Sequence, residues 1–326
     1  MMKRRKVFIS LGFCLIMIIS VSMPCLAANF NDEMTQTADF YAKNSKVLES
    51  WNENLVLAAS GKIDGVTPIA VVSDDTAAGY AKVILNSFAL KIDEDARKAA
   101  VDALVALQAD DGSFGDIYSS IYPIIALKSA KADFKADDAV KWVLTKQFAD
   151  GGFSWDGATE GDLDTTAMVL NCLSAFTDKP SVKDSIAKAK DFIKSQLQEN
   201  GGFVVWGMDN SNTLAVVITA LIDIGENVNS DEWNKMGESL LRFKNGDASY
   251  RLAPDFEEVN DSYSTMSALG ALYSLKNNAS LYKQLMTNQS LGGGFVLDST
   301  VLLIGIAAVI LIAIVVFVFV VLRKKD

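Results

Sequence analysis

The chain has 326 residues, with 30 Lys and Arg against 40 Asp and Glu, and a formal net charge of −10. An acidic chain repels phosphate groups, which excludes nucleic acid as its partner. The sequence contains no histidine, which excludes Ser-His-Asp and Cys-His catalysis and histidine-ligated metal sites. We therefore predict no metal ion, no cofactor and no nucleic-acid partner.

The amino-terminal segment has the pattern of a secretory signal peptide. Residues 3–6 are basic, residues 7–23 are largely apolar, and small residues follow at Ala27 and Ala28. Cleavage there leaves Cys172 as the one cysteine of the mature chain, so no internal disulfide is expected. We predict a signal peptide over residues 1–28, and an exported protein without disulfides fits a bacterium.

The carboxyl-terminal segment is typical of a membrane anchor. Residues 301–322 carry no charge and, at about 1.5 Å per residue, are long enough to cross a bilayer as a helix. The basic run that follows is placed in the cytoplasm by the positive-inside rule. We predict an extracellular domain at the cell membrane over residues 29–290, a linker over 291–300, a transmembrane helix over 301–322 and a cytoplasmic tail over 323–326.

A short motif recurs in the middle of the chain at intervals of about 40 to 50 residues. Each of three copies is headed by a glutamine and ends in one or two glycines and a phenylalanine, and a degenerate copy at 245–250 ends in Tyr250. The motif residues are Gln108, Gly112 and Phe114 in the first copy; Gln147, Gly151, Gly152 and Phe153 in the second; and Gln196, Gly201, Gly202 and Phe203 in the third.

Helical patterns occupy the segments between the motifs. Apolar residues such as Ala100, Leu104 and Leu107 recur at helical spacing before the first motif, whereas residues 167–176 and 214–224, after later motifs, are more evenly apolar. We expect the helices before each motif to be outer and those after it to be inner. The predicted pairs are 35–90, 93–130, 136–177, 181–226 and 230–276, with half of a sixth near 281–286.

The second copy reads Gln-x-x-Asp-Gly-Gly-Phe-x-Trp over residues 147–155 and resembles the repeat of the prenyltransferase and terpenoid-cyclase α/α-toroid superfamily. The resemblance implies an all-α fold, an α/α toroid of about five to six helical hairpins around a central cavity. It also implies that the glutamine and aromatic residues, Trp155 included, tie neighbouring hairpins together. The zinc site of protein prenyltransferases needs a histidine, and Cys172 does not match the thioester motif of related toroids.

Residues 162–167 read Asp-Leu-Asp-Thr-Thr-Ala and resemble the Asp-x-Asp-Asp-Thr-Ala acid motif of squalene-hopene-type cyclases. Asp162 and Asp164 align with the first two acidic positions, and in that family the middle aspartate protonates an alkene. Thr165 replaces the third acid, and the histidine that commonly supports the acid is missing. The other interpretation is that Asp164 is a helix N-cap, as Asp75, Asn212 and Asp261 would be before other inner helices.

Acidic and aromatic residues near the starts of the inner helices predict a ligand-binding rim around one mouth of the cavity. Such rims suit sugars, cationic groups or amphiphiles. The candidates, besides Asp162 and Asp164, are Asp116, Tyr118, Trp155, Trp206, Asp209, Asp261 and Tyr263.

The sequence leaves three functions open. The leading prediction is a non-enzymatic, membrane-anchored surface module that binds an unknown ligand or protein, because catalytic parts of the related enzymes are missing. One alternative is an extracellular enzyme of terpenoid-cyclase type, or of polysaccharide hydrolase or lyase type, that uses Asp162 or Asp164. The other is a purely structural spacer. Fold identity does not choose among them, because function resides in the site.

Overall fold

Helices account for most of the residues that the computed structural model describes, which are 24–44, 48–90, 94–155, 158–255 and 261–287. All of them belong to one compact unit, Met1–Gly292. Within these residues the strands are limited to the antiparallel hairpin of β1 (Val204–Val205) and β2 (Met208–Asp209) and to isolated bridges. The predicted all-α class is therefore confirmed.

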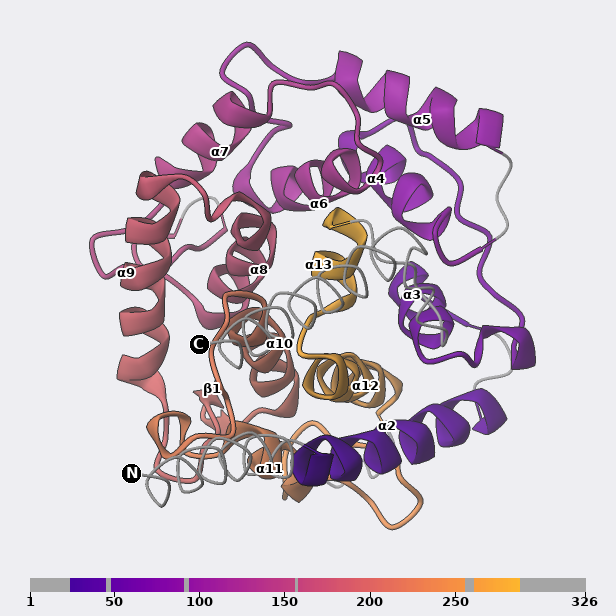
Figure 1. The fold of residues 1–326 in the computed structure, drawn as a ribbon, viewed down its shortest axis with the longest axis vertical. Coiled ribbons are helices and arrows are strands. Elements are labelled where there is room, and N and C mark those ends of the chain that lie inside the picture. The colour runs from indigo at the N-terminus through magenta and orange to yellow at the C-terminus, as the bar shows by residue number, and fades with distance from the viewer. Residues whose placement is uncertain (1–23, 45–47, 91–93, 156–157, 256–260, 288–326) are drawn as a thin grey trace, which may run out of the picture. The chain divides into compact units, whose positions relative to one another are not determined.

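Outer and inner helices alternate along most of the chain (Figure 1). The outer helices are α2 (Pro24–Asn44), α5 (Glu94–Ala106), α7 (Ala136–Leu144), α9 (Pro180–Gln196) and α11 (Met236–Leu240). The inner helices are α3 (Trp51–Ala59), α4 (Ala77–Asn86), α6 (Ile117–Ser129), α8 (Leu163–Leu173), α10 (Ser211–Asp223) and α12 (Ser262–Asn277). The shorter helices are η1 (Ile63–Gly65), η2 (Ser174–Phe176), η3 (Asp231–Trp233), η4 (Leu241–Phe243) and α13 (Leu281–Met286).

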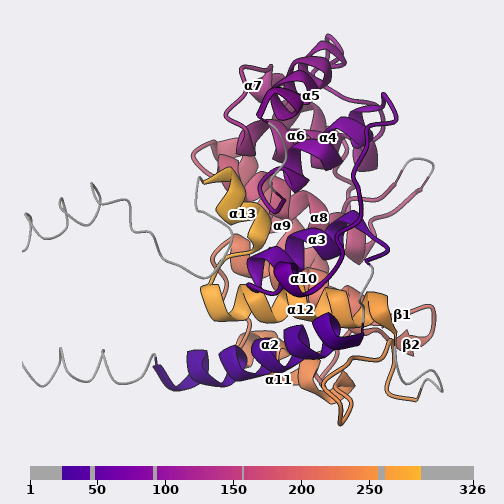
Figure 2. The same cartoon turned by 90° about the vertical axis from the view of Figure 1, so that its right-hand side faces the viewer.

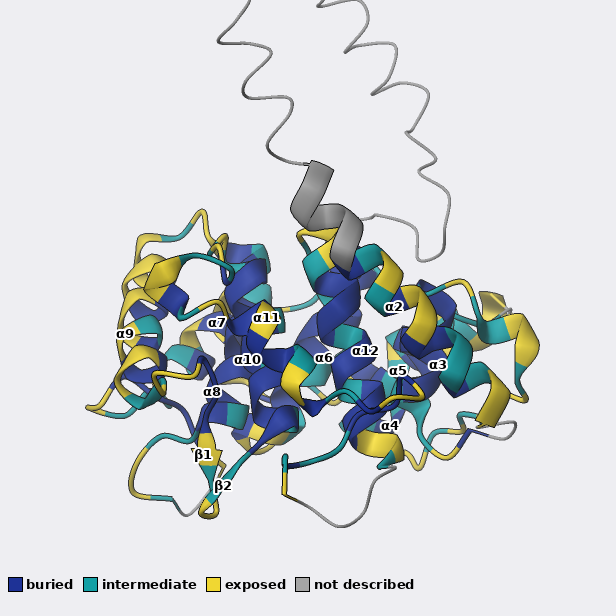
Figure 3. Ribbon diagram, turned by 90° about the horizontal axis from the view of Figure 1, so that it is seen from below, coloured by how far each residue is buried: buried dark blue, intermediate teal, exposed yellow. Residues whose placement is uncertain are grey.

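The distribution of apolar residues explains which helices are inner. Helix α5 has 13 residues and buries only Ala100 and Leu104, whereas α10, of the same length, buries residues on all sides. Figure 3 shows the inner helices largely dark blue and α9 with a broad exposed face. The assignment of the more apolar helices to the inner layer agrees with the sequence prediction.

The inner helices form a ring. Helices α4, α6, α8, α10 and α12 pack on one another in that order, and α3 contacts both α12 and α4. Helix α2 lies along the outside of α12 and so joins the beginning of the chain to the last large helix (Figure 1). The predicted pair at 35–90 is wrong, because that segment holds parts of three helices; the stretch around η1, with Gly65 and Pro68, separates α3 from α4.

Helix α13 is not half of a sixth hairpin, as its position in the sequence suggested. It packs against α3, α6, α8 and α12 and lies inside the ring of inner helices, where Figure 1 draws it in yellow. Asn278, with a left-handed backbone (φ 52°), ends α12 and lets the chain turn inward. With six residues α13 is too short to form a layer of its own, and it buries Leu281, Leu285 and Met286.

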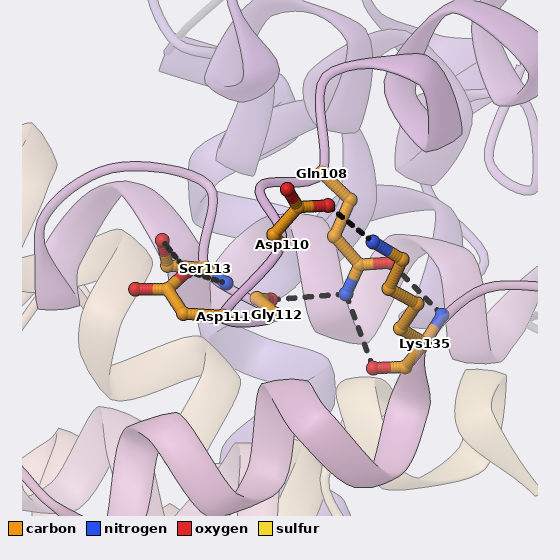
Figure 4. Close-up of polar contacts among 6 residues, drawn as sticks. All are labelled: Gln108, Asp110, Asp111, Gly112, Ser113 and Lys135. Atoms are coloured by element: carbon orange, nitrogen blue, oxygen red, sulfur yellow. Dashed lines mark hydrogen bonds and ion pairs between the residues drawn. The ribbon is translucent and has the colours of Figure 1, made fainter.

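The recurring motif forms the turn between an outer helix and the next inner helix. In the first copy, Gln108 Nε2 donates to the carbonyl oxygens of Gly112 (2.9 Å) and Lys135 (3.1 Å), and the Lys135 N–H donates to Gln108 Oε1 (2.9 Å) (Figure 4). Lys135 is the N-cap residue of α7, so the glutamine ties one hairpin to the next. Gln147 makes the same tie to Ser185 O of α9 at 2.9 Å.

The third copy departs from this pattern. Gln196 is the last residue of α9, and Leu197 occupies the place that Gln108 and Gln147 hold in their turns. The tie to the next outer segment comes instead from Asn234 Nδ2, which donates to Gln198 O at 2.8 Å. The structural role expected of Gln196 is therefore wrong, because the glutamine lies one residue too early to reach the neighbouring hairpin.

A shared Asx turn identifies four copies of the motif. In each, a side-chain oxygen accepts the N–H of the residue two positions later, and a buried aromatic residue follows. The fourth copy has Ala248 at φ 73° where the others have glycine. The acceptors are Asp111, Asp150, Asn200 and Asp247, and the aromatic residues are Phe114, Phe153, Phe203 and Tyr250.

The predicted membrane segments fall largely outside the described residues. This applies to the transmembrane helix at 301–322, to its flanks, and to residues 1–23 of the predicted signal peptide; residues 24–28 belong to α2. Within the described ranges, the helices lack the combination of length and hydropathy that a bilayer span requires.

Candidate active site at the mouth of the ring

The inner helices that follow motif turns begin with polar N-caps, and together these starts define one end of the ring, which we call the mouth. Asp116 Oδ1 accepts the Ser119 N–H at 2.6 Å, and Asp162 Oδ1 accepts the Thr165 N–H at 2.7 Å. Asn210 caps α10 and Asp261 caps α12 in the same way. These side chains satisfy backbone donors that the helix itself leaves free.

The cap of α8 is Asp162, so the interpretation of Asp164 as an N-cap is wrong. The N–H of Asp162 donates to Phe153 O at 2.8 Å, which holds Asp162 in an extended conformation before the helix. Asn210 is held to Phe203 O in the same way, and it takes the cap expected of Asn212. In α4 the cap is Thr76 rather than Asp75, whereas Asp261 caps α12 as predicted.

Thermal or urea unfolding tests this assignment. We expect Asp162→Ala to lower the free energy of unfolding by about 1 kcal/mol, because the Thr165 N–H loses its acceptor. Asp164→Ala should change it by less than about 0.5 kcal/mol or raise it, because a buried, unpaired carboxyl group is itself unfavourable. Equal losses in the two variants would contradict the assignment.

The caps fix which side chains face the middle of the ring. Because an α-helix has 3.6 residues per turn, positions two, six and nine after a cap share one face. The sixth and ninth positions line a cavity inside the ring, as does Tyr263 at a second position; the other second positions lie one helical turn nearer the mouth. The second positions are Tyr118, Asp164, Asn212 and Tyr263; the sixth are Tyr122, Met168, Val216 and Ser267; and the ninth include Asn171, Thr219 and Gly270.

The cavity has a volume of about 120 Å³. Its walls combine apolar, aromatic and small hydroxyl side chains, and none of the described residues that line it is charged. Asn52 and Val56 of α3 contribute to one side. Ser280, Leu281 and Tyr282 contribute the part formed by α13, which lies at the opposite end of the ring from the β1–β2 hairpin (Figure 2).

Aromatic rings from three distant segments meet at this cavity. The Tyr122 ring centroid lies 5.3 Å from that of Trp51, 6.5 Å from that of Tyr118 and 5.9 Å from that of Tyr282. Burial raises the pKa of the Tyr122 and Tyr282 phenols, so both stay neutral at physiological pH. We call these four residues the aromatic cluster. The sequence pattern indicated only Tyr118, because residues as far apart in the chain as Trp51 and Tyr282 leave no local signal of their proximity.

Asp164 differs from the carboxylates that cap the helices at the mouth. Its Oδ1 is buried, and no hydrogen-bond donor reaches it within the described structure. Burial raises the pKa of Asp164 and the neighbouring Asp162 carboxylate adds to the rise, while the Thr213 hydroxyl opposes it. Asp162, by contrast, accepts hydrogen bonds from the Thr165 N–H and from Ser154 Oγ. Asp164 therefore keeps its proton to a higher pH than an ordinary aspartate.

Some rim candidates lie close to Asp164. Burial raises the pKa of the Tyr263 phenol, and Tyr118, Asp164 and Asp261 are near enough to add to that rise. The structure therefore brings Tyr118, Asp162, Asp164, Asp261 and Tyr263 to one mouth.

The remaining candidates have other surroundings. Trp155 is 63% exposed, so its expected packing on the motif turn is wrong; the buried Phe153 occupies that place. Trp206, at the tip of the β1–β2 hairpin, is 84% exposed. Asp209 Oδ2 accepts from Arg242 Nη1 at 3.0 Å and from Asn200 Nδ2 at 3.1 Å. Asp116 also lies at the mouth, where its carboxylate caps α6.

A family model named the prenyltransferase alpha-alpha toroid domain matches residues 73–187 and 167–300, which together make up more than half of the chain. The chain belongs to this family. The ring of the structure is thus an alpha-alpha toroid, as the resemblance of the motif implied.

Several solved structures are similar to this chain, and two of them are as follows. The type II terpene cyclase MstE from Scytonema, in its apo form, is 11% identical, has a TM-score of 0.57, and aligns over 77% of this chain and 99% of its own. The ent-copalyl diphosphate synthase from Streptomyces platensis is 15% identical, with a TM-score of 0.44, over 76% of this chain and 50% of its own. No curated protein matches the sequence.

These comparisons correct the leading prediction of a non-enzymatic binding module. The structure that shares the toroid fold over almost its whole length is that of an enzyme, a type II terpene cyclase. The comparisons therefore favour the enzyme alternative over the leading prediction. Cys172 does not provide its chemistry, since burial within α8 raises the pKa of the thiol to about 12.

A buried carboxylate fastens α13 inside the toroid. Asp223, at the end of α10, accepts the Ser280 N–H at 2.7 Å and the Ser280 hydroxyl at 2.5 Å. Asn171 Nδ2 donates to it at 2.8 Å, and Lys283 Nζ donates to the Asp223 carbonyl oxygen. Burial raises the pKa of Asp223 from 3.8 to about 6, although all of these partners favour the ionised form.

This shift predicts a pH-dependent stability. The folded state binds the Asp223 proton more tightly than the unfolded chain, so the stabilisation is complete below about pH 4 and is lost as the pH rises to about 6. At 1.36 kcal/mol per pKa unit, the loss is up to about 3 kcal/mol. Urea unfolding gives the free energy of unfolding of the wild-type protein and of Asp223→Asn at pH 4 and at pH 7. The difference between the two proteins should change by this amount between the two pH values, and a difference that stays the same would contradict the prediction.

Proposed function

We propose that this toroid is a terpene-cyclase-like enzyme in which Asp164 donates a proton to an alkene of an acyclic isoprenoid. The observation that carries the proposal is the environment of Asp164. Its carboxyl group takes no part in capping α8, has a buried oxygen without a donor, and holds its proton more tightly than an ordinary aspartate. It also lies above a cavity whose lining is uncharged.

The reaction is an isomerisation. The Asp164 O–H adds its proton to one alkene carbon, which leaves a carboxylate and a tertiary carbocation. A second double bond attacks the cation and closes a ring, and loss of a proton from a neighbouring carbon to water forms the final alkene. The cationic intermediate suits the rings of Tyr122 and Tyr282, which line the cavity, because aromatic rings attract positive charge.

Hydrolysis or lysis of a polysaccharide fits this site less well. Glycosidases need two carboxyl groups that flank the scissile bond. Asp162, the nearest partner of Asp164, is committed to the cap of α8 and to Ser154, and the lining of the cavity offers no second acid. We therefore place the polysaccharide alternative second.

Two departures from the cyclase motif affect how Asp164 can act as an acid. Thr165 replaces the third acidic residue and donates its N–H to Asp162, and the chain has no histidine. Burial therefore keeps Asp164 protonated. A histidine partner that would make it a stronger acid is missing. This favours substrates whose alkene yields a tertiary cation, which is the most easily formed.

The experiment is incubation with acyclic isoprenoids in D₂O. We expect farnesol, geranylgeraniol or squalene to give a cyclic isomer that carries one deuterium at the carbon protonated first. Gas chromatography with mass spectrometry reads both the isomer and the label. A panel of these substrates that yields no cyclic isomer, or a cyclic isomer without deuterium, would contradict proton-initiated cyclisation.

We also propose that the site works outside the cell, on the basis of the signal and anchor patterns at 1–28 and 301–322. Protease added to intact cells is expected to remove the domain, while a cytoplasmic marker survives. Protection of the domain in cells that remain intact would contradict this location.

A further inference from the structure

Helix α13 occupies space that an isoprenoid chain needs. It lies inside the ring, where it contacts four helices of the inner layer. Leu281 and Tyr282 line the cavity together with Tyr122 and Met168, and the Tyr282 ring contacts that of Tyr122. The Tyr282 hydroxyl donates to Asn52 Oδ1 at 3.3 Å, so α13 reaches across from the α12 side to α3.

The remaining volume is small for the proposed reaction. A cavity of about 150 Å³ holds a ligand the size of benzene, whereas sites for larger ligands measure about 300–1,000 Å³. The present cavity, at about 120 Å³, has room for roughly one isoprene unit. A chain that folds on itself and closes a ring spans at least two.

The attachment of α13 is suited to opening. The helix is held by the Asp223 cluster, in which polar groups of Ser280, Lys283 and Asn171 surround a buried carboxylate. It is also held by the Tyr273 hydroxyl of α12, which donates to Gln284 Oε1 at 2.7 Å. Burying that charge is costly, which offsets part of the gain from packing Leu281 and Leu285. The link from α12 to α13 is short, running from Asn278 to Ser280, so the helix can swing outward about this turn without disturbing α12.

We propose that α13 is an intramolecular plug, and that the toroid accepts a folded isoprenoid only when α13 leaves the cavity. The proposal rests on the cyclase function for the identity of the ligand class, but its test needs no turnover. A ligand that binds only the open state shifts the population toward that state, and its apparent affinity is reduced by the fraction of open molecules.

Hydrogen exchange on the full-length chain tests the plug with two alcohols. Farnesol has three isoprene units and 3-methylbut-2-en-1-ol has one. We expect farnesol to increase amide exchange in residues 281–286 and the small alcohol to leave it unchanged or to slow it. Protection of these amides by farnesol would overturn the proposal, because it would mean that the long ligand binds against a docked α13.

Variants supply a second measurement. Ser280→Ala removes the hydroxyl that bonds Asp223 and caps α13, so farnesol should bind about tenfold more tightly as the open fraction rises. Thr76→Ala removes a similar cap from α4 and should leave the affinity unchanged. An unchanged or weaker affinity in Ser280→Ala, with its fold verified by circular dichroism, would overturn the plug.

The cyclase function and the plug can be tested independently of each other. Asp164→Asn should keep both the farnesol-induced exchange and the effect of Ser280→Ala, since neither requires proton transfer. If these effects appear but no isoprenoid is cyclised, the plug stands and the cyclase function falls. If cyclisation occurs while α13 stays protected in the presence of farnesol, the cyclase function stands and the plug falls.

Discussion

Asp164→Asn is expected to lower the rate of isoprenoid cyclisation by about a thousandfold or more, equivalent to about 4 kcal/mol of barrier. Asparagine has nearly the same shape, but its amide does not donate an ionisable proton. The fold should be unaffected or slightly stabilised, because the amide keeps the shape of the side chain and removes the cost of burying a carboxylate charge. Turnover and thermal unfolding of the same preparation measure both effects.

The matched control lies in the same hairpin. Asp150 accepts the N–H groups of Gly152 and Gly161 in the motif turn, and the third copy of that turn carries Asn200 at the equivalent place. Asp150→Asn keeps the acceptor of the Gly152 N–H and loses that of the Gly161 N–H, so it should keep the rate and lower the free energy of unfolding by only about 1 kcal/mol. Comparable activity in the Asp164→Asn and wild-type proteins would remove Asp164 from the mechanism.

The acid also predicts a pH profile. Only protonated Asp164 reacts, so the rate should fall as the pH rises through its pKa, which burial holds above the usual value of 3.8.

Gly151→Ala should destabilise the protein by about 4 kcal/mol, enough to prevent folding of many domains. Gly151 has φ +91°, a conformation that L-residues rarely adopt, and an added Cβ would lie 2.4 Å from Lys188 O of α9. The second motif turn lies directly against the backbone of α9, where Gln147 also bonds Ser185 O. Neither the turn nor the helix has room to shift without breaking that contact.

Two other glycines allow the cost of backbone strain to be distinguished from the cost of steric overlap. Gly225 has φ +94° and no atom within 4 Å of an added Cβ, so Gly225→Ala should cost only about 1 kcal/mol, from strain. An added Cβ at Gly246 would meet no atom within 4 Å, and the backbone there is not in the positive-φ region. Gly246→Ala should therefore have almost no effect on the free energy of unfolding. Urea unfolding measures all three variants; a loss in Gly151→Ala no larger than that in Gly225→Ala would contradict the packing argument.

The sequence predicts the layers of the fold well because each depends on local pattern. Evenly apolar segments became inner helices, and the motif became a turn wherever glycine or an equivalent residue permits a left-handed backbone. The cap of α8 was misplaced because a non-local hydrogen bond decides it: Asp162 pairs with Phe153 before the helix begins. A pattern of two aspartates one residue apart does not show which of them the preceding turn holds.

The site was predicted only in part for a similar reason. Asp164, Tyr118 and Tyr263 stand at equivalent places in separate repeats, so repetition of the pattern located them. Trp51 and Tyr282 lie outside the repeated segments, and only closure of the ring brings them to Tyr122. The position of α13 inside the cavity likewise depends on one buried residue, Asp223, in a different hairpin.

Closure of the ring through α2 and α12 changes how the repeats hold together. An open array of helical hairpins can lose its end units one at a time, because each unit contacts only its neighbours. Here α2 covers α12, and Lys244 bonds Glu33 and Gln36 across more than 200 positions. The toroid therefore has no end units to fray, and the contact between α2 and α12 makes the loss of structure cooperative.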